Sequence, residues 1–204
     1  MMMKFFSSTH FLLTAVMLII VIFSSGCVCF QKPPPSCQAR QVTLQQVTGW
    51  DLSGALSVTY NKKGDFAHFT WVQKENCYTI NIFGPLNISN IRIVGDANNV
   101  TLWQAKKKYI RAKTPEQLIY DQLGWRLPVS NIRYWILAHP VPGKIDAINF
   151  DQHGHLVFLR QNGWQIKYFG FRAHRSKHID LPQIIEIKNE EITIKIKVTK
   201  RIFW

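Results

Sequence analysis

Acidic residues are scarce in this 204-residue sequence, which has 12 Asp and Glu against 25 Lys and Arg and a formal net charge of +13. A surface with this imbalance favours an anionic partner, which is nucleic acid, an acidic protein or phospholipid headgroups. The sign of the charge does not choose among the three. Intrinsic disorder is excluded, because 47% of the residues are hydrophobic and 13% are aromatic.

The common catalytic motifs are also missing. The sequence has no Gly-x-Ser-x-Gly elbow, no phosphate-binding glycine loop and no His-Glu-x-x-His. His153 and His155 flank a glycine, and that pattern is more typical of a turn than of a metal site. Asp146 and Asp151 are better explained as carboxylates at hairpin ends than as paired acids, since no nucleophile accompanies them. We therefore expect a protein that is not an enzyme and uses no metal or other cofactor.

A positively charged residue, Lys4, precedes the apolar run Phe11–Phe23. The run is shorter than the ~20 residues that span a bilayer, and this length is typical of a signal peptide. We therefore interpret residues 1–26 as an export signal, which removes nucleic acid from the expected partners. The small residues before Cys27 resemble the lipobox of bacterial lipoproteins, although Ser24 replaces the usual leucine. That resemblance implies an acylated Cys27; the alternative is ordinary secretion with a free or disulfide-bonded Cys27.

Only four cysteines are present. One acyl chain binds a membrane marginally and two or more bind it stably, so an acylated Cys27 would hold the protein on its membrane. Val28 follows in place of Asp, and the bacterial sorting rule then implies a lipid-anchored protein of the outer membrane that faces the periplasm. Export also permits a disulfide such as Cys37–Cys77, but the sequence does not determine the pairing.

The rest of the chain divides into a tether and a folded domain. Residues 27–35 end in three prolines that form a semi-rigid spacer, and residues 36–204 form the domain, beginning with a weakly amphipathic helix at 36–47. From Trp50 onward apolar and polar residues alternate, most clearly from Ile192 to Val198, as in half-buried strands. Turn signals separate these strands: Lys63-Gly64-Asp65, Gly84-Pro85, Gly95-Asp96, His153-Gly154 and Asn162-Gly163. Many short antiparallel strands indicate a barrel or a sandwich.

Two helices are predicted to interrupt the strands. Thr114-Pro115-Glu116-Gln117 has the pattern of a helix cap with proline in the first turn, and that helix should end at Gly124. A second helix begins near Ser130 and ends before Pro140. The sequence also has 7 Trp, 13 Phe and 6 Tyr, many for one small sheet domain. These aromatic residues either fill an ordinary core or surround a lipid-sized cavity between a curved sheet and the helices.

Six short motifs occur in an order that resembles the LolB family of outer-membrane lipoprotein receptors. They are Trp50-x-x-x-Gly54-Ala55-Leu56-Ser57-Val58, Phe69-x-Trp71-x-Gln73, Gly84-Pro85-Leu86, Pro128-Val129-Ser130, Tyr134-Trp135-Ile136 and Gln161-x-Gly163-Trp164-x-Ile166-x-Tyr168. The resemblance covers Trp50 to Trp204. It implies a mainly β fold, an unclosed antiparallel β-barrel (a half-barrel) whose short α-helical lid encloses a hydrophobic cavity. One departure is Asn87, which stands where the family tends to have glycine; asparagine also tolerates positive φ.

The resemblance also implies a function. The protein would accept acylated lipoproteins from a soluble periplasmic carrier resembling LolA, and would insert them into outer-membrane phospholipid without nucleotide hydrolysis, as a monomer. Trp71, Trp135 and Trp164 would line the cavity, with plain core packing as the alternative. Leu86, after Pro85 at a hairpin tip, would enter the bilayer, unless it folds back on the sheet. Two other functions stay open: a lipid- or fatty-acid-binding lipoprotein without a protein donor, and a secreted lipid hydrolase.

Overall fold

The computed structural model describes residues 42–44, 46–84, 91–104, 108–124, 126–174 and 179–204. The predicted signal peptide, the tether with Cys27, and the hairpin segment with Pro85 and Leu86 lie outside these ranges. Among the described helices none has the length and hydrophobicity needed to cross a bilayer.

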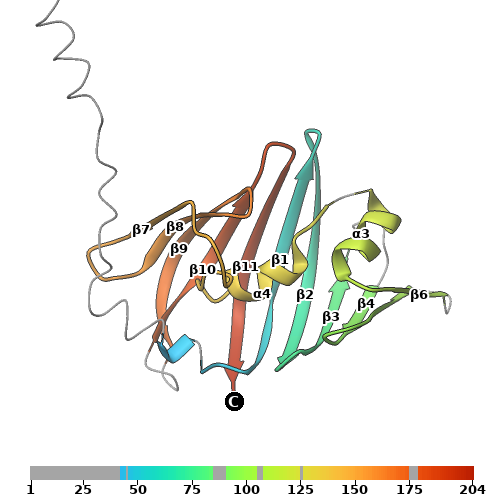
Figure 1. Cartoon of the computed structure of the whole chain (residues 1–204), viewed down its shortest axis with the longest axis horizontal. Coiled ribbons are helices and arrows are strands. Elements are labelled where there is room, and N and C mark those ends of the chain that lie inside the picture. The colour runs from blue at the N-terminus through green and yellow to red at the C-terminus, as the bar shows by residue number, and fades with distance from the viewer. Residues whose placement is uncertain (1–41, 45, 85–90, 105–107, 125, 175–178) are drawn as a thin grey trace, which may run out of the picture. The chain divides into compact units, whose positions relative to one another are not determined.

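Eleven strands in the described part of the chain form one antiparallel sheet (Figure 1). The order across the sheet is β6-β5-β4-β3-β2-β1-β11-β10-β9-β8-β7, so each half is a meander and the first and last strands meet at the centre. Strands β6 and β7 remain edges, which confirms the predicted unclosed barrel. The strands are β1 Gly49–Tyr60, β2 Lys63–Lys74, β3 Cys77–Phe83, β4 Ile91–Gly95, β5 Val100–Gln104, β6 Lys108–Ala112, β7 Ala147–Phe150, β8 Leu156–Gln161, β9 Trp164–His174, β10 Ile179–Lys188 and β11 Ile192–Phe203.

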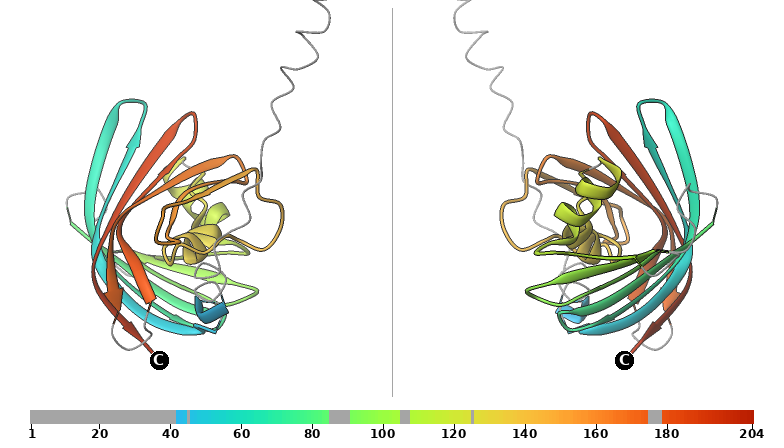
Figure 2. Two further views of the ribbon diagram at one scale, coloured as in Figure 1. Left: turned by 90° about the vertical axis from the view of Figure 1, so that its left-hand side faces the viewer. Right: turned by 90° about the vertical axis from the view of Figure 1, so that its right-hand side faces the viewer.

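Two helices lie against the concave face of the curved sheet, as Figure 2 shows. Helix α3, Pro115–Leu123, begins at Thr114, whose side chain accepts a hydrogen bond from the Gln117 N–H at 3.2 Å, and ends at Gly124 with φ 73°. Helix α4 spans Val129–Trp135. Both predicted helices are therefore confirmed. Residues 42–44 are helical as well, and most of the expected helix at 36–47 lies outside the described residues.

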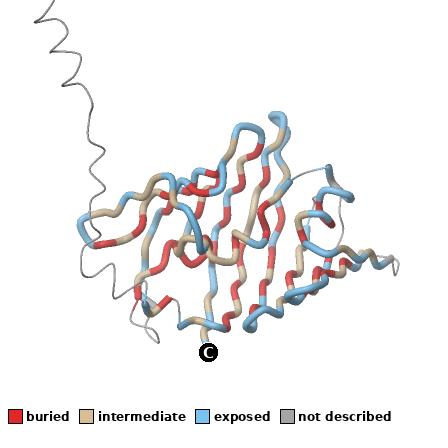
Figure 3. Tube along the Cα trace, in the orientation of Figure 1, coloured by how far each residue is buried: buried red, intermediate tan, exposed pale blue. Residues whose placement is uncertain are grey.

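Alternation along the strands separates an inner from an outer face. On β2, Phe69 and Trp71 are buried while the neighbouring His68 and Val72 are exposed. On β11 the apolar residues from Ile192 to Val198 are buried while the intervening lysines are exposed. Figure 3 shows the same alternation along the long central strands. The inner face therefore carries the core and the outer face meets solvent.

The hairpins confirm most turn predictions and correct one. Asn162 and Gly163 have φ values of 53° and 78° and join β8 to β9 as predicted. The prediction of the β1–β2 turn at Lys63-Gly64-Asp65 is wrong, because the turn lies at Asn61-Lys62, with φ values of 47° and 62°. A two-residue turn with both φ values positive matches the twist of the strands, so Gly64 becomes a strand residue opposite Thr59.

The two halves of the sheet join only where β1 pairs with β11. Leu56 lies opposite Ile196, and Val58 lies opposite Ile194. The register shifts between Ser53 and Gly54, and a Cβ on Gly54 would lie 2.0 Å from the Lys197 carbonyl oxygen. Glycine is required here because the two backbones approach too closely for any side chain.

Candidate functional site

An apolar cavity of about 120 Å³ lies between the inner face of the sheet and the two helices. Only two of its lining residues, Gln104 and Gln122, are polar. The apolar ones are Leu56, Val58, Phe69, Trp71, Ile80, Ile82, Ile91, Ile93, Leu102, Ile119, Leu127, Val129, Ile132, Ile136, Ile194 and Ile196. The alternating pattern of β1–β5 and β11 supplies one wall, and the apolar stripes of α3 and α4 supply the other.

The size of this cavity shows that the aromatic and aliphatic side chains do not fill the interior. About 10–15 Å³ of such space holds one water molecule, so 120 Å³ has room for roughly ten. Cavities with walls of this composition stay dry and take apolar ligands. The site can therefore shield hydrocarbon from water.

Trp71 is the predicted aromatic residue that the fold brings to this cavity. Its side chain is buried, and its indole N–H donates to Gln73 Oε1 at 3.1 Å. Gln73 Nε2 donates in turn to the Glu75 carbonyl at 2.7 Å. The Trp50 ring packs against Trp71 with centroids 5.2 Å apart. The Trp71 ring is thus held by a hydrogen bond to Gln73 and by packing against the Trp50 indole.

Trp135 and Trp164 are buried in the core rather than in the cavity wall. The Trp135 indole N–H donates to Gln161 Oε1 at 3.3 Å, and the same oxygen accepts the Val141 N–H at 2.9 Å. Gln161 Nε2 donates to the carbonyl oxygens of Val141 and Lys144. This buried amide therefore ties α4 and the segment after it to β8. The aromatic spacing in the sequence does not distinguish a core position from a cavity wall.

A second cavity, of about 410 Å³, has a lining of polar and apolar residues. Trp50 lines it, together with Glu75, Arg133, Tyr134 and other residues. The Arg133 guanidinium lies 4.9 Å from the centroid of the Tyr134 ring. His139 is half-buried in this wall; burial lowers its pKa, while the hydrogen bond from Nδ1 to the Pro140 carbonyl acts in the opposite direction. No motif or periodicity in the sequence predicted this cavity.

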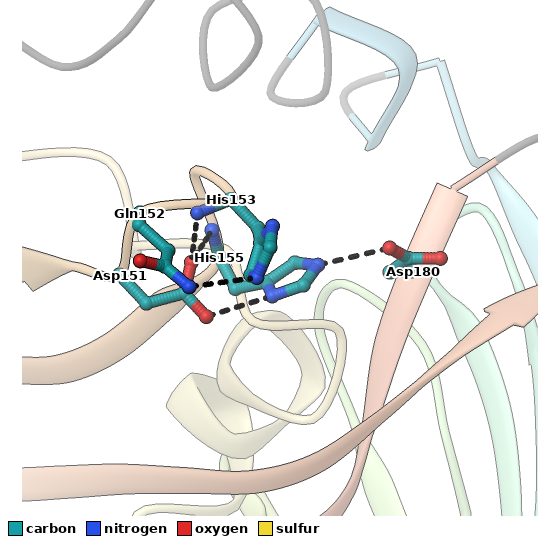
Figure 4. A network of polar contacts seen from close by, with 5 residues as sticks. All are labelled: Asp151, Gln152, His153, His155 and Asp180. Atoms are coloured by element: carbon teal, nitrogen blue, oxygen red, sulfur yellow. Dashed lines mark hydrogen bonds and ion pairs between the residues drawn. The ribbon is translucent and has the colours of Figure 1, made fainter.

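The β7–β8 hairpin holds a polar cluster, shown in Figure 4. His155 Nδ1 lies 2.9 Å from Asp151 Oδ2, and its Nε2 lies 2.9 Å from Asp180 Oδ2 on β10. Partial burial raises the pKa of Asp151, but hydrogen bonds from the His155 and His153 backbones and the His155 ring outweigh it and lower the pKa overall. The cluster ties the turn between β7 and β8 to strand β10. In the part of the chain that the structure describes, no three potential metal ligands converge.

Comparison with known proteins identifies the family. The sequence profile of the family described as "Outer membrane lipoprotein LolB" matches residues 48–200. The chain belongs to the LolB family. The outer-membrane lipoprotein LolB of Coxiella burnetii strain RSA 493 is 36% identical in an alignment of 182 residues that covers 85% of each chain. That of Francisella tularensis subsp. novicida is 30% identical in an alignment of 191 residues that covers 90% of each chain. The protein is thus an outer-membrane lipoprotein, and the acylation of Cys27 stays a prediction.

Solved structures show the same fold at low sequence identity. A LolA superfamily protein from Nitrosomonas europaea aligns with a TM-score of 0.50 and 10% identity, over 81% of this chain and 92% of the other. A DUF1329 family protein from Desulfovibrio piger aligns with a TM-score of 0.53 and 7% identity, over 82% of this chain and 90% of the other. At these identities the likeness concerns the fold alone.

Proposed function

We propose that this LolB family member accepts acylated lipoproteins from a soluble periplasmic carrier and inserts them into the phospholipid of the outer membrane. The observation that supports this proposal is the apolar cavity of about 120 Å³ between sheet and helical lid. Acyl chains that leave a membrane must be kept from water, at a cost of ~0.8 kcal/mol per exposed CH₂. A cavity lined by leucine, isoleucine, phenylalanine and tryptophan removes that cost during transfer.

The handover would run down an affinity gradient, since no nucleotide-binding motif occurs in the sequence. Each ~1.4 kcal/mol by which this cavity binds the acyl chains better than the carrier gives tenfold directionality. Removal of residues 1–26 would take away only Lys4, which leaves 24 Lys and Arg against 12 Asp and Glu, or a net charge of +12. That charge would steer an acidic carrier surface toward this protein and speed the encounter at low salt. The carrier, the cargo and the monomeric state of the receptor are all parts of the proposal.

Leu86, in the segment that follows β3, is proposed to enter the bilayer when cargo is released. A leucine that moves from water into lipid gains ~1.5–3 kcal/mol, which is enough to part the headgroups locally. We expect Leu86→Glu to take cargo from the carrier at the normal rate and to fail in delivering it to liposomes. Normal delivery by this variant would remove Leu86 from the mechanism.

Depletion in cells tests the proposed function as a whole. If the protein is the receptor, acylated proteins accumulate on the soluble carrier when it is removed, and they disappear from the outer membrane. A lipid shuttle without a protein donor leaves the carrier unloaded, and a hydrolase releases product from an ester substrate in vitro. Either of these two results, with no loaded carrier, would overturn the receptor function.

A further inference from the structure

Exposed aromatic side chains gather on the outer face of the sheet at the end where β3 stops. Phe66 on β2 and Phe83 on β3 are 46% and 40% exposed. His68 lies between them: it is opposite Phe83 in the strand register, and its ring meets the Phe66 ring edge-on at 5.2 Å. We call Phe66, His68 and Phe83 the aromatic patch. Phe83 is followed almost directly by the segment that contains Leu86.

The strand register continues this patch across the sheet as a band. His68 lies opposite Ala55, and Ala55 lies opposite Lys197 on β11. Lys197 lies opposite Ile184, which lies opposite Phe169, and these two apolar side chains are 39% and 47% exposed. One row of cross-strand neighbours thus carries exposed apolar groups on β3, β9 and β10 with a lysine in the middle.

The neighbouring row adds positive charge. Phe66 lies opposite Ser57, which lies opposite Lys195. Lys195 and Lys197 are exposed, and Lys195 pairs with Glu186 at 3.1 Å. No carboxylate of the described residues forms an ion pair with Lys197. The two rows together carry four large exposed apolar side chains beside Lys197, which has no ion-pair partner among the described residues. Such a combination is unusual on a surface that meets only water.

We propose that this band, the aromatic patch with Lys195 and Lys197 and the apolar pair Ile184 and Phe169, is a contact surface for anionic phospholipid. Phenylalanine and aliphatic side chains bury at the boundary between headgroups and acyl chains when basic residues flank them, and each lysine near an anionic surface adds attraction. A lipid-anchored protein of the outer membrane works beside such a surface. The band would press the β2–β3 end of the sheet onto the headgroups.

The alternative partner, an acidic protein, is less well matched to this surface. A protein interface usually anchors a few side chains in pockets, whereas the band is spread in rows over several neighbouring strands. Headgroups and the upper parts of acyl chains adapt to such a surface without a matching shape. The two partners give different outcomes in the experiments below.

Photo-crosslinking of the full-length acylated protein tests the contact. A benzophenone amino acid is placed at Phe66, at Phe83 or at Val72, and the protein is reconstituted in vesicles of phosphatidylethanolamine and phosphatidylglycerol. Val72 is the matched control, because it is exposed on the same face of the same strand, about 20 Å along from Phe66. We expect lipid adducts at positions 66 and 83 and several-fold fewer at 72. Equal labelling at all three positions, or adducts to protein in place of lipid, would overturn the proposal.

Three double variants test what this contact contributes to delivery and to lipid binding. Phe66→Ser with Phe83→Ser should slow delivery of cargo to these vesicles several-fold while uptake of cargo from the carrier is unchanged. The control is Val72→Ser with Ile202→Ser, both exposed on the outer face opposite Asp51; it should deliver normally. Lys195→Gln with Lys197→Gln should lower lipid adducts at position 83 on the order of tenfold, and only on vesicles with phosphatidylglycerol.

These readouts separate the contact surface from the proposed function. Lipid adducts at 66 and 83 in a protein that takes no cargo would keep the contact surface and remove the receptor role. Normal delivery by the Phe66 and Phe83 double variant, with its melting temperature unchanged, would remove the contact surface and keep the receptor role.

Discussion

At the scale of single residues, the side chain of Gln161 connects β8 to α4 and to the segment that follows α4. It is fully buried and makes hydrogen bonds to Trp135, Val141 and Lys144. A buried amide is stable only when its donors and acceptors are paired. Replacing the glutamine would leave the buried polar groups of Trp135, Val141 and Lys144 without this partner. Gln161 therefore fixes the position of α4 relative to β8.

We expect Gln161→Leu to lower the free energy of unfolding by roughly 2–4 kcal/mol, because it leaves several buried polar groups without partners. The check is the urea midpoint at an unchanged m-value. Gln165→Leu on the adjacent strand β9 is the control, since Gln165 is exposed, and it should change stability by no more than ~0.5 kcal/mol. Similar midpoints for the two variants would show that the Gln161 network adds nothing.

His139 makes stability depend on pH in a predictable direction. Burial lowers its pKa below the ordinary histidine value of 6.5, so the unfolded chain binds a proton more readily than the folded protein does. The stabilisation is then complete above pH 6.5 and is lost as pH falls through 6.5 toward the lower folded pKa.

We expect His139→Gln, which keeps a donor for the Pro140 carbonyl, to lose less stability than wild type between about pH 7 and pH 5. The measurement is the difference between the two unfolding free energies at each pH, at constant salt. The other histidines are unchanged in the variant, so they cancel in this difference. A difference that stays constant over the range would show that His139 titrates normally.

At the scale of elements, Gly54 controls the pairing between β1 and β11. A Cβ at this position would lie 2.0 Å from the Lys197 carbonyl oxygen, which belongs to backbone and has little freedom to move. Gly54→Ala should therefore destabilise the domain by at least ~3 kcal/mol. Gly64→Ala is the matched control, because its Cβ would meet only Thr59 Oγ1 at 3.6 Å. Thermal unfolding of both variants decides: equal melting temperatures would exclude a special role for Gly54.

The lid helices are joined by one carboxylate. Glu116 on α3 accepts the Ser130 backbone N–H at 2.7 Å and the Ser130 hydroxyl at 3.2 Å. Helix α4 has no side-chain cap at Pro128, so Glu116 serves as its cap from outside. Glu116→Ala should cost about 1 kcal/mol and speed amide hydrogen exchange in α4. Asp121→Ala is the control, because Asp121 is an exposed carboxylate on the same helix, and it should leave exchange in α4 unchanged.

The sequence was informative where local chemistry decides the element. Thr114 and Gly124 define α3, and Asn162-Gly163 defines a hairpin, because caps and positive-φ turns have residue preferences of their own. The β1–β2 turn was misplaced since Gly64 is a common turn residue that here sits in a strand. The strands from Ile91 to Ala112 were not predicted, being only five residues each. The pairing of β1 with β11 has no local signal at all.

At the scale of the whole molecule, the cavity is the space that the inner face of the sheet and the two helices leave unfilled. The family resemblance predicted its existence, but periodicity did not predict which aromatic residues would line it: Trp71 does, whereas Trp135 and Trp164 pack in the core. All three are buried, but Trp71 lies on β2, whose inner face lines the cavity, whereas Trp164 lies on β9 and Trp135 on α4 bonds to Gln161 of β8. Which of them faces the cavity is a property of the assembled domain.

Filling the cavity tests its use. Leu56 lines it from β1, and Leu56→Trp would occupy space that hydrocarbon requires. We expect binding of a synthetic acylated lipopeptide to weaken more than tenfold, with the melting temperature lowered by only a few degrees. Ile202→Trp on the outer face is the control, because Ile202 is exposed, and it should bind normally. Unchanged lipopeptide affinity in Leu56→Trp would place the acyl chains elsewhere.

The central position of β11 has a consequence for how the domain matures. Strand β11, one of the two neighbours of β1, is the last described strand in chain order. A polypeptide that crosses the inner membrane amino-terminus first therefore presents β1 and β2 long before β11 arrives. During that interval one side of β1 offers unpaired N–H and C=O groups, which other chains can join. Protection against misassembly is therefore needed throughout translocation, and a chain truncated before β11 should aggregate rather than fold in part.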